Sequence, residues 1–466
     1  MLNYGILNYH FKMTYKNYFI LFLLIVCTIF SVNAQNQSWT LEQCIEYAKK
    51  NNLQIKQEQY NLQLSEINLK KNRTLVLPAL NGNASCDNNF GKNVDQITNE
   101  FTADNVISNN FYASTNINLF KGFQLLNSIR RSQIEYEASQ YNLKAIENEI
   151  SINIATAFLQ ILYNNEILKK LEQQNEITVK EIERTKKLFE LGAVSSVVLL
   201  NLEAQLTVEE HQILISRTEL EMSYLLLSQI LDLPSHKNFE ILIPDINIED
   251  SINIPNIESI YEYALKNQPE VKSSELQIEI AKKSYLMSKG VYYPSLSLGI
   301  SSGTGYSEAS KKIINIVESN PIYEVIPYKD QINRNFYYSV GVNLTIPIFN
   351  SMQNKYNIDK SKINIYQAEN LLQQKTTALI KTINQLYFDA LSSIKKFQSA
   401  QKQLTYLMSA FNVAEERFTL QDISFIEYQD AKIKVSTANS ELLQAKYEFI
   451  FKIKLLDFYL GKEIKL

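Results

Sequence analysis

Few side chains in this sequence are arranged in a way that could do chemistry, and the clearest group is an acidic pair near the C-terminal end. Glu427 and Asp430 are three residues apart in a segment with a helical pattern, so their carboxylates share one helix face. The ordinary interpretation of such a pair is a solvated surface. The alternative is a site that attracts cations, and the choice depends on where the fold places this helix.

Patterns typical of catalysis are missing from the sequence. The three histidines, His10, His211 and His236, belong to no cluster with metal-ligand spacing. There is no nucleophile elbow, no phosphate-binding glycine loop and no zinc-type cysteine spacing. Cys44 and Cys86 are too far apart along the chain's predicted helix for a disulfide, and we expect both to be buried small hydrophobes. We therefore predict no enzyme, no catalytic residue, no metal site and no cofactor.

Composition indicates which elements must position the acidic pair. The 466 residues include only 11 glycines and 9 prolines, the residues that punctuate loops, so long uninterrupted helices are expected. The formal net charge is −3, and no basic face is concentrated in the sequence. These two features exclude a nucleic-acid partner.

The N-terminal segment has the composition of a secretory signal. Two lysines precede the apolar run FILFLLIVCTIF, which leads to a small-residue cleavage site over residues 31–35. We predict a signal peptide over residues 1–34, with translation starting at Met1 or Met13. A retained membrane anchor is the alternative, but the apolar run is short for a membrane span.

The rest of the chain is a tandem repeat. Pro78 and Leu80 recur as Pro294 and Leu296, 216 residues later, and beyond an insertion the offset becomes 229 residues. The predicted units are a first repeat over residues 35–234, a linker or equatorial segment over 235–256, and a second repeat over 257–466.

Each repeat has the same order of elements. A helix of about 35 residues ends at the proline, two alternating strands follow, and a helical stripe of about 70 residues then begins. At 1.5 Å per residue this stripe is about 100 Å long, far beyond an ordinary globular helix. It turns at a tip and returns as a further helix.

The strands alternate apolar with small polar side chains. In VYYPSLSLGIS, which begins at Val291, the apolar Leu296, Leu298 and Ile300 alternate with serine and glycine. A soluble sheet would point the apolar face at a core, whereas a membrane barrel would point it at lipid. The secretory signal and the aromatic residues at the strand ends favour the membrane. No later segment is apolar enough for a spanning helix, so a membrane crossing must use strands.

Four strands per chain cannot close a barrel, and open strand edges are not tolerated in lipid. The chain is therefore expected to share its barrel with copies of itself. Two copies would give eight strands and a filled interior, whereas three would give twelve strands and a lumen. We predict an α+β membrane protein, a trimeric 12-stranded β-barrel continued by a long α-helical coiled tunnel.

The doubled order of these motifs resembles the TolC family of outer-membrane efflux proteins over essentially the whole mature chain. The residues that carry the resemblance are WTLEQCIEYAKKNNLQI from Trp39, the two Pro-led strand starts, and the helix-to-helix tips at 189–201 and 418–430. The resemblance implies an outer-membrane location with the helices in the periplasm. It implies a homotrimer that contacts outer-membrane lipid, a periplasmic adaptor protein and an inner-membrane pump. The implied function is a passive export duct of a tripartite efflux or type I secretion system.

The resemblance also assigns roles to individual residues. Family tips accept the adaptor and family acidic residues form rings at the entrance, so Glu427 and Asp430 are expected to form a periplasmic gate. The expected adaptor contacts are Leu191, Gly192, Ala193, Val194, Ser195, Leu420, Ile423 and Ser424. The expected junctions between helices and barrel are Pro78, Pro294, Phe120 and Phe349. Gln421 stands where the second tip should have a glycine.

The main alternative is a soluble periplasmic coiled-coil adaptor or scaffold. Such a protein would share the long helices and the hairpin tips but would lack the doubled, tyrosine-flanked strands. The two hypotheses differ in whether the mature protein is soluble without detergent. The cargo, whether a drug, a metal ion or a protein, does not follow from the sequence.

Overall fold

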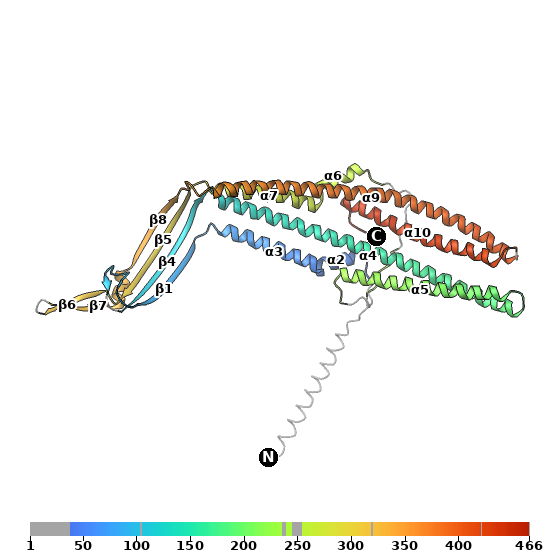
Figure 1. Cartoon of the computed structure of the whole chain (residues 1–466), viewed down its shortest axis with the longest axis horizontal. Coiled ribbons are helices and arrows are strands. Elements are labelled where there is room, and N and C mark those ends of the chain that lie inside the picture. Colours follow the sequence, from blue (N-terminus) through green and yellow to red (C-terminus); the bar gives the residue numbers. More distant parts are fainter. Residues whose placement is uncertain are drawn as a thin grey trace, which may run out of the picture.

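The computed structural model describes residues 38–102, 105–234, 239–244, 254–317, 320–420 and 422–465. The predicted signal peptide and parts of the predicted linker lie outside these residues. The described chain is drawn out along one axis, with a sheet at one end and helices running from it to the other end (Figure 1).

Each half begins with two short helices rather than one. The first-half pair is α2 (Leu41–Asn51) and α3 (Leu53–Thr74), and the second-half pair is α6 (Ile257–Asn267) and α7 (Pro269–Gly290). The prediction of a single helix of about 35 residues is therefore wrong in both halves. Asn52 breaks the first, because its side chain accepts hydrogen bonds from the backbone N–H groups of Gln54 and Ile55 and caps a new helix. Pro269 breaks the second, because it lacks an N–H and suits only a first helical turn.

Two long helical hairpins dominate the molecule. The first joins α4 (Gln124–Glu190) to α5 (Ser196–Ile230), and the second joins α9 (Gln353–Thr419) to α10 (Phe425–Tyr459). The outgoing helices have 67 residues each and the returning helices 35 each. The predicted helical stripes of about 100 Å are therefore present. In the described part of the chain, no helix combines the length and the apolarity that a membrane crossing requires.

The main core lies where the short helices meet the middle of α4. Ile154 and Ile161 on α4 are fully buried against Leu41 and Cys44 of α2. Burial raises the pKa of the Cys44 thiol to about 12. A second, smaller cluster joins α6 to α9 around Ile383. The core therefore holds the helices together near the middle of the molecule. Neither the sheet nor the hairpin tips are part of it.

The sheet contains the four predicted strands. They are β1 (Ala79–Asn89), β4 (Val106–Lys121), β5 (Ser295–Ser307) and β8 (Tyr337–Thr345), all antiparallel in the order β1-β4-β5-β8. Pro78 and Pro294 directly precede β1 and β5, as expected at the junctions. Strands β1 and β8 are the two edges of this sheet.

The two faces of the sheet differ in polarity. Leu298 lies opposite Ile117 on one side and Val342 on the other, so apolar residues form a continuous band across three strands. Cys86 falls on the same face of β1 as Leu80 and is exposed, which makes the expectation of a buried thiol wrong there. A serine, asparagine and glycine face lies on the other side, because side chains alternate along a strand.

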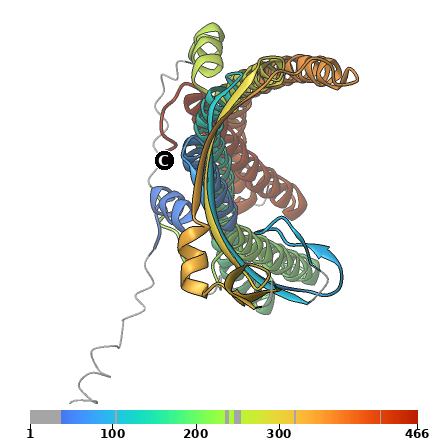
Figure 2. The same cartoon turned by 90° about the vertical axis from the view of Figure 1, so that its left-hand side faces the viewer.

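Short elements lie at the end of the sheet that is remote from the helices. They are β2 (Asn93–Val94), β3 (Phe101–Thr102), β6 (Lys311–Val317), β7 (Asn320–Val325) and α8 (Tyr328–Arg334). Their positions show which face of the curved sheet is convex. Figure 2 shows the sheet end-on as a curved strip, with α8 outside the curve and the β2–β3 pair inside it. Thr304, which has the same parity as Leu298, donates a hydrogen bond to the Ile332 carbonyl of α8. The apolar face is therefore the convex face.

Candidate functional site at the hairpin tips

The first tip joins α4 to α5 through a glycine turn. Gly192 has φ +70°, a conformation that L-residues rarely adopt. Its N–H donates to the Phe189 carbonyl, and the Ala193 N–H donates to the Leu188 carbonyl, both at 2.9 Å. These two bonds satisfy the last carbonyls of α4. Ser195 is the N-cap of α5, but its side chain makes no capping hydrogen bond.

The second tip makes the matching turn with different side chains. The Asp422 N–H donates to the Arg417 carbonyl at 2.8 Å, as Ala193 does to Leu188 in the first tip. The Arg417 guanidinium also donates to the Asp422 carboxylate at 2.7 Å. Gln421, at the position of the glycine, lies outside the described residues. The second tip is thus closed by an ion pair that the first tip lacks.

The acidic pair lies at the start of α10 and is already engaged locally. Ser424 and Glu427 form a capping box, in which the Ser424 N–H donates to Glu427 at 2.9 Å and the Glu427 N–H donates to the Ser424 hydroxyl at 3.2 Å. Asp430 accepts from Lys434, one turn further along. Both carboxylates are exposed on one face of the helix, as the spacing predicts.

The opposite face of α10 is bonded to the first hairpin. The Lys432 ammonium, with 8% of its side chain exposed, donates to Glu181 of α4 at 2.7 Å. The Tyr428 hydroxyl donates to the same carboxylate at 2.8 Å. Burial, followed by the charge of Glu181, raises the pKa of Tyr428 well above its usual range, so the phenol stays protonated. One carboxylate therefore joins the two hairpins near their tips.

Aromatic rings pack beneath the second tip. Tyr428 stacks on Phe418 with centroids 4.7 Å apart, and Phe425 and Phe411 complete the cluster. In the first tip the residue matching Phe418 is Phe189, which is partly exposed. Among the described residues, the first tip has no matching cluster of rings.

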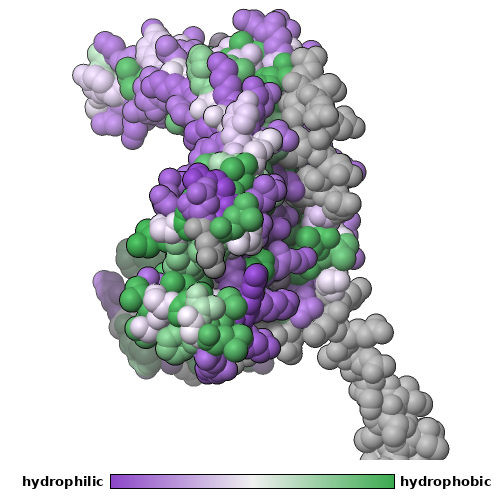
Figure 3. Space-filling view, turned by 90° about the vertical axis from the view of Figure 1, so that its right-hand side faces the viewer, coloured by the Kyte–Doolittle hydropathy of each residue, from purple (hydrophilic) through white to green (hydrophobic). Residues whose placement is uncertain are grey.

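The predicted adaptor-contact residues lie at the end of the molecule. Leu191 is 81% exposed and Leu420 is 79% exposed, although each is the C-cap of a long helix. Gly192, Ala193, Ser195 and Ser424 are exposed, and Val194 and Ile423 are half-buried. Figure 3 looks onto this end and shows apolar side chains gathered over the first, lower tip, with strongly hydrophilic ones next to apolar ones at the second. The tips therefore present free surface of two different kinds.

The helix-to-sheet junctions depend on aromatic and glycine contacts. Leu119 is an extra residue in β4, so Phe120 lies opposite Leu296 on the apolar face. Phe120 packs edge-on against Phe123, which contacts Tyr293. Phe349, the matching residue of the second half, is exposed.

Two glycines at the same junction were not anticipated from the sequence. Gly122, with φ +55°, lies against the backbone of Gly290, and a side chain on either residue would clash with the other. The two glycines do not occupy equivalent repeat positions. Their close contact is created by the packing of α4 on α7, so no local pattern announces it.

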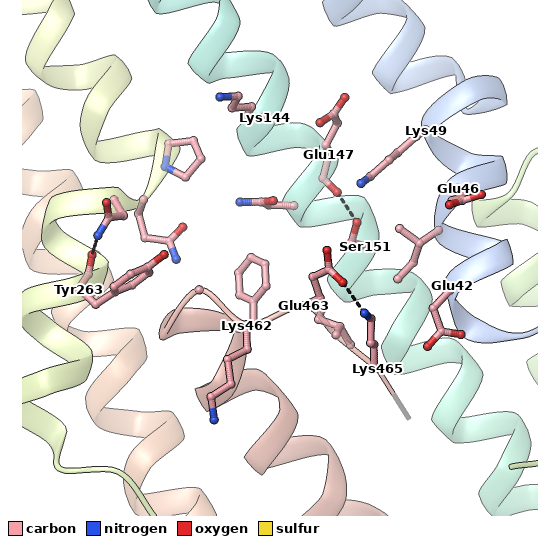
Figure 4. Close-up of a pocket in the computed structure, with 18 residues that line it drawn as sticks. Glu42, Glu46, Lys49, Lys144, Glu147, Ser151, Tyr263, Lys462, Glu463 and Lys465 are labelled. Atoms are coloured by element: carbon pink, nitrogen blue, oxygen red, sulfur yellow. Dashed lines mark hydrogen bonds and ion pairs between the residues drawn. The ribbon is translucent and has the colours of Figure 1, made fainter.

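A separate groove of about 550 Å³ lies near the middle of the molecule, between α2, α4, the α6–α7 corner and the C-terminal segment (Figure 4). Its charged lining residues are Glu42, Glu46, Glu147, Glu463, Lys49, Lys144, Lys462 and Lys465. Lys465 pairs with Glu463 at 2.6 Å, and Lys462 pairs with Asp457 at 2.7 Å. The charges balance, so the groove favours a ligand of neither sign. In the described part of the chain, no group of three or more His, Cys, Asp or Glu side chains is placed to hold a metal ion.

Comparison with known families agrees with the doubled architecture. The family model described as "Outer membrane efflux protein" matches residues 44–231 and again residues 260–461. The chain belongs to the outer membrane efflux protein family. It is therefore an outer-membrane protein of an efflux family, as the resemblance in the sequence implied. This membership argues against the soluble scaffold hypothesis.

Individual relatives are distant in sequence but close in fold. This outer membrane efflux protein is 19% identical to outer membrane protein TolC of Escherichia coli strain K12 over 310 residues, which is 65% of this chain and 59% of TolC. Among solved structures, CusC aligns with a TM-score of 0.74 at 16% identity and covers 92% of this chain and 93% of CusC. The Campylobacter jejuni CmeC outer membrane channel aligns with a TM-score of 0.72 at 18% identity and covers 92% and 86%. At these identities the structural likeness shows the shared fold.

Sequence reasoning missed the side chains that join the hairpins. Glu181 is one of many acidic residues on a long helix, and the sequence analysis singled out neither it nor Tyr428 and Lys432, which lie beside the acidic pair. Their four-residue spacing does place Tyr428 and Lys432 on one face. Their partner lies about 250 residues earlier, and only the packing of α10 on α4 reveals it.

Proposed function

We propose that this outer membrane efflux protein is one subunit of a homotrimeric, passive export duct. Its sheet carries the proposal: four strands with two open edges, an apolar convex face and a polar concave face, continued by helices of 67 residues. A convex apolar face suits lipid, and a polar concave face suits a water-filled lumen. The duct acts without chemistry of its own.

The open edges of the sheet determine the assembly. Strand edges β1 and β8 cannot remain unpaired in lipid, because each free N–H and C=O would lose its hydrogen bond to water. Pairing β8 of one copy with β1 of the next closes a ring. Three copies give twelve strands, enough for a lumen, whereas a ring of eight strands is filled by its own side chains.

The helical hairpins form the periplasmic end of the proposed duct. They extend about 100 Å from the sheet, so they reach through the periplasm when the sheet lies in the outer membrane. The exposed tips, Leu191–Ser195 in the first hairpin and Leu420–Ser424 in the second, then dock a periplasmic adaptor that links the duct to an inner-membrane pump. The apolar first tip supplies the larger hydrophobic contact.

The acidic pair forms the entrance gate in this proposal. Threefold symmetry repeats Glu427 and Asp430 around the axis and produces two rings of carboxylates from the second hairpin alone. Matching positions in the first hairpin are Val198 and Asn201, which add no charge. Such rings favour cations over anions and bind divalent ions at the entrance.

Single-channel recording in planar bilayers tests both the duct and its gate. The purified protein is expected to be a trimer in detergent and to conduct cations in preference to anions, with calcium blocking the current. Glu427→Gln combined with Asp430→Asn is expected to abolish the calcium block and reduce the cation preference. Glu203→Gln with Glu210→Gln, which removes two exposed acids from α5, is the matched control.

The outcomes separate the two parts of the proposal. Unchanged selectivity and calcium block in the Glu427 and Asp430 variant would reject the gate and leave the duct intact. A mature protein that is soluble without detergent and never conducts would reject the duct itself.

A further inference from the structure

The connection from β1 to β4 folds to the concave side of the sheet. Strand β1 ends at Asn89 and β4 begins at Val106, and these two residues lie opposite each other at the end of the sheet remote from the helices. Between them, β2 and β3 pair as a separate two-stranded hairpin. Figure 2 shows this β2–β3 hairpin inside the curve of the sheet, whereas α8 lies outside it. The hairpin is therefore on the side that faces the lumen of the proposed duct.

Two contacts with β5 attach the turn of the hairpin to the concave face. The Ser307 hydroxyl donates a hydrogen bond to the Asp95 carboxylate. Ile97 lies so close to Gly305 that a β-carbon on the glycine would be 2.8 Å from the Ile97 Cδ1. Residues 305 and 307 alternate with Thr304, which contacts α8 on the convex face, so their side-chain positions are on the opposite face. The turn is thus packed on the wall that would bound the lumen.

Asp95 shapes the turn as well as attaching it. One carboxylate oxygen accepts hydrogen bonds from the N–H groups of Ile97 at 3.1 Å and Thr98 at 2.7 Å, and from the Thr98 hydroxyl at 3.0 Å. The other oxygen accepts from Ser307. The Asp95 N–H donates to the Glu100 carbonyl at 3.0 Å and closes the turn. Asp95 is 5% exposed, so one buried carboxylate sets both the shape of the turn and its place on the wall.

Ser307 is a fixed anchor, because groups on both sides of the sheet hold it. Its side chain is fully buried, and the Gln331 side chain of α8 accepts from its N–H and donates to its carbonyl, both at 3.0 Å. The Ser307 hydroxyl accepts from the Ala309 N–H at 3.1 Å, which leaves its proton for Asp95. The hairpin is therefore bonded to a rigid point of the wall.

We propose that the β2–β3 hairpins of three copies form a constriction at the outer mouth of the duct and limit the size of the molecules that pass there. The bond from Ser307 to Asp95 holds each hairpin inward. The inference rests on the trimer of the proposed function. It adds a second narrow point, at the opposite end of the molecule from Glu427 and Asp430.

The dimensions of the proposed barrel make three inward hairpins an obstruction. Twelve strands spaced about 4.8 Å apart and tilted by about 40° give a barrel radius of roughly 12 Å. A β-layer that packs face to face on another lies about 10 Å from it. Hairpins packed on the wall therefore extend close to the threefold axis and leave a narrow passage between them. Lys92 and Phe101, which are exposed and form a cation–π contact on the hairpin, are available to line this passage.

Thiol labelling from outside intact cells tests the constriction in the full-length protein. In a Cys86→Ser background, Ser301→Cys places a thiol on the concave face, four residues nearer the helices than Gly305. In the proposed duct, a reagent that cannot cross the outer membrane reaches this thiol only through the outer mouth. A small charged methanethiosulfonate is compared with a large poly(ethylene glycol) maleimide. The readout is the ratio of the two labelling rates, which reports the size limit separately from the reactivity of the thiol.

Ser307→Ala is the main variant, because it removes the bond to the wall and leaves the bonds by which Asp95 shapes the turn. A hydrogen bond to a carboxylate is strong enough that its loss is expected to raise the rate with the large reagent by about tenfold. The rate with the small reagent is expected to stay nearly constant. Ser85→Ala, which removes a hydrogen bond from a serine to Asp87 on β1, is the matched control and is expected to change neither rate. Replacement of residues 93–102 by a short glycine linker removes the hairpin and is expected to accelerate the large reagent at least as much as Ser307→Ala.

The outcomes separate the constriction from the duct. Labelling by the large reagent that is as fast in the wild-type hairpin as in the linker variant overturns the constriction and leaves the duct standing. Acceleration by the linker variant but not by Ser307→Ala overturns the role of the bond to Asp95. Equal acceleration by Ser307→Ala and Ser85→Ala overturns that role too, because a general loosening of the sheet then explains both. A Ser301→Cys thiol that reacts with neither reagent even in the linker variant rejects the water-filled lumen, and with it the proposed duct.

Discussion

The two hairpin tips make matching backbone turns from different side chains. In the first, Gly192 provides the left-handed residue and no side chain supports the turn. In the second, an ion pair between Arg417 and Asp422 closes the turn, and Ser424 with Glu427 caps the next helix. Backbone hydrogen bonds hold both turns, and in the second tip side chains add to them.

This difference leaves the tips with different surfaces and different attachments. The first tip exposes apolar side chains such as Leu191, Val197 and Leu200. The second tip exposes carboxylates beside the apolar Leu420 and Ile426, and its inner face is bonded to the first hairpin through Glu181. In the proposed duct, the first tip therefore suits docking and the second suits gating. Four sets of variants test this distinction, from the largest expected effect to the smallest.

Removal of the carboxylate that joins the hairpins is expected to have the largest effect. Glu181→Ala leaves the Lys432 ammonium buried, and its remaining hydrogen-bond partner among the described residues is the Thr178 hydroxyl at 3.5 Å. Breaking a buried ion pair typically costs about 3–5 kcal/mol of unfolding free energy, because one charge remains without compensation. Chemical denaturation followed by circular dichroism measures this loss, and hydrogen exchange is expected to accelerate along α10.

Glu172→Ala is the control for this variant. Glu172 lies on the same helix and pairs with Arg217 at 2.9 Å, but both side chains are about half exposed. Exposed pairs contribute roughly 0.2–1 kcal/mol. Equal losses for Glu181→Ala and Glu172→Ala would show that the hairpins are not joined through Glu181.

The sequence was sufficient to predict the elements but not the contacts between them. Period-two alternation around Leu296 predicted the strands, and apolar stripes such as that of Ile154 and Ile161 predicted the long helices, because both signals are local. The break at Asn52 was missed, since a polar residue inside a helical pattern becomes a cap only when its side chain turns back on the backbone. The acidic pair was found from its spacing. Its structural neighbours were not, because Glu181 is distant in the chain.

Replacement of the glycine in the first tip is expected to have the second largest effect. Gly192→Ala places a β-carbon on a residue with φ +70°, which costs about 1–2 kcal/mol for an L-residue. Thermal unfolding of the helical region measures the loss. Asp422→Ala in the second tip removes one exposed ion pair and is expected to cost less than about 1 kcal/mol. A larger loss of unfolding free energy for Asp422→Ala than for Gly192→Ala would show that the ion pair of the second tip matters more than the glycine of the first.

The two N-cap serines provide a matched pair. Ser424→Ala removes a capping box and is expected to cost about 1 kcal/mol. Ser195→Ala removes a hydroxyl that makes no capping hydrogen bond, so a negligible change is expected. Hydrogen exchange at the first turn of each returning helix detects the difference locally. Similar fraying of α5 and α10 in the two variants would contradict the assignment of side-chain capping to the second tip alone.

The smallest effect is expected for a double variant that gives the second tip two side chains of the first. Asp430→Asn with Lys434→Gln gives the second hairpin the side chains that Asn201 and Gln205 supply at the matching positions of the first. The lost ion pair is exposed and spaced by one turn, so it contributes about 0.3–0.5 kcal/mol at low salt. In 1 M salt the Debye length falls to about 3 Å, and the double variant is expected to match the wild-type stability. A loss that persists at high salt would indicate that Asp430 has a structural partner other than Lys434. A salt-sensitive loss would mean that the fold does not require the charge of Asp430, which leaves this carboxylate available for the proposed gate.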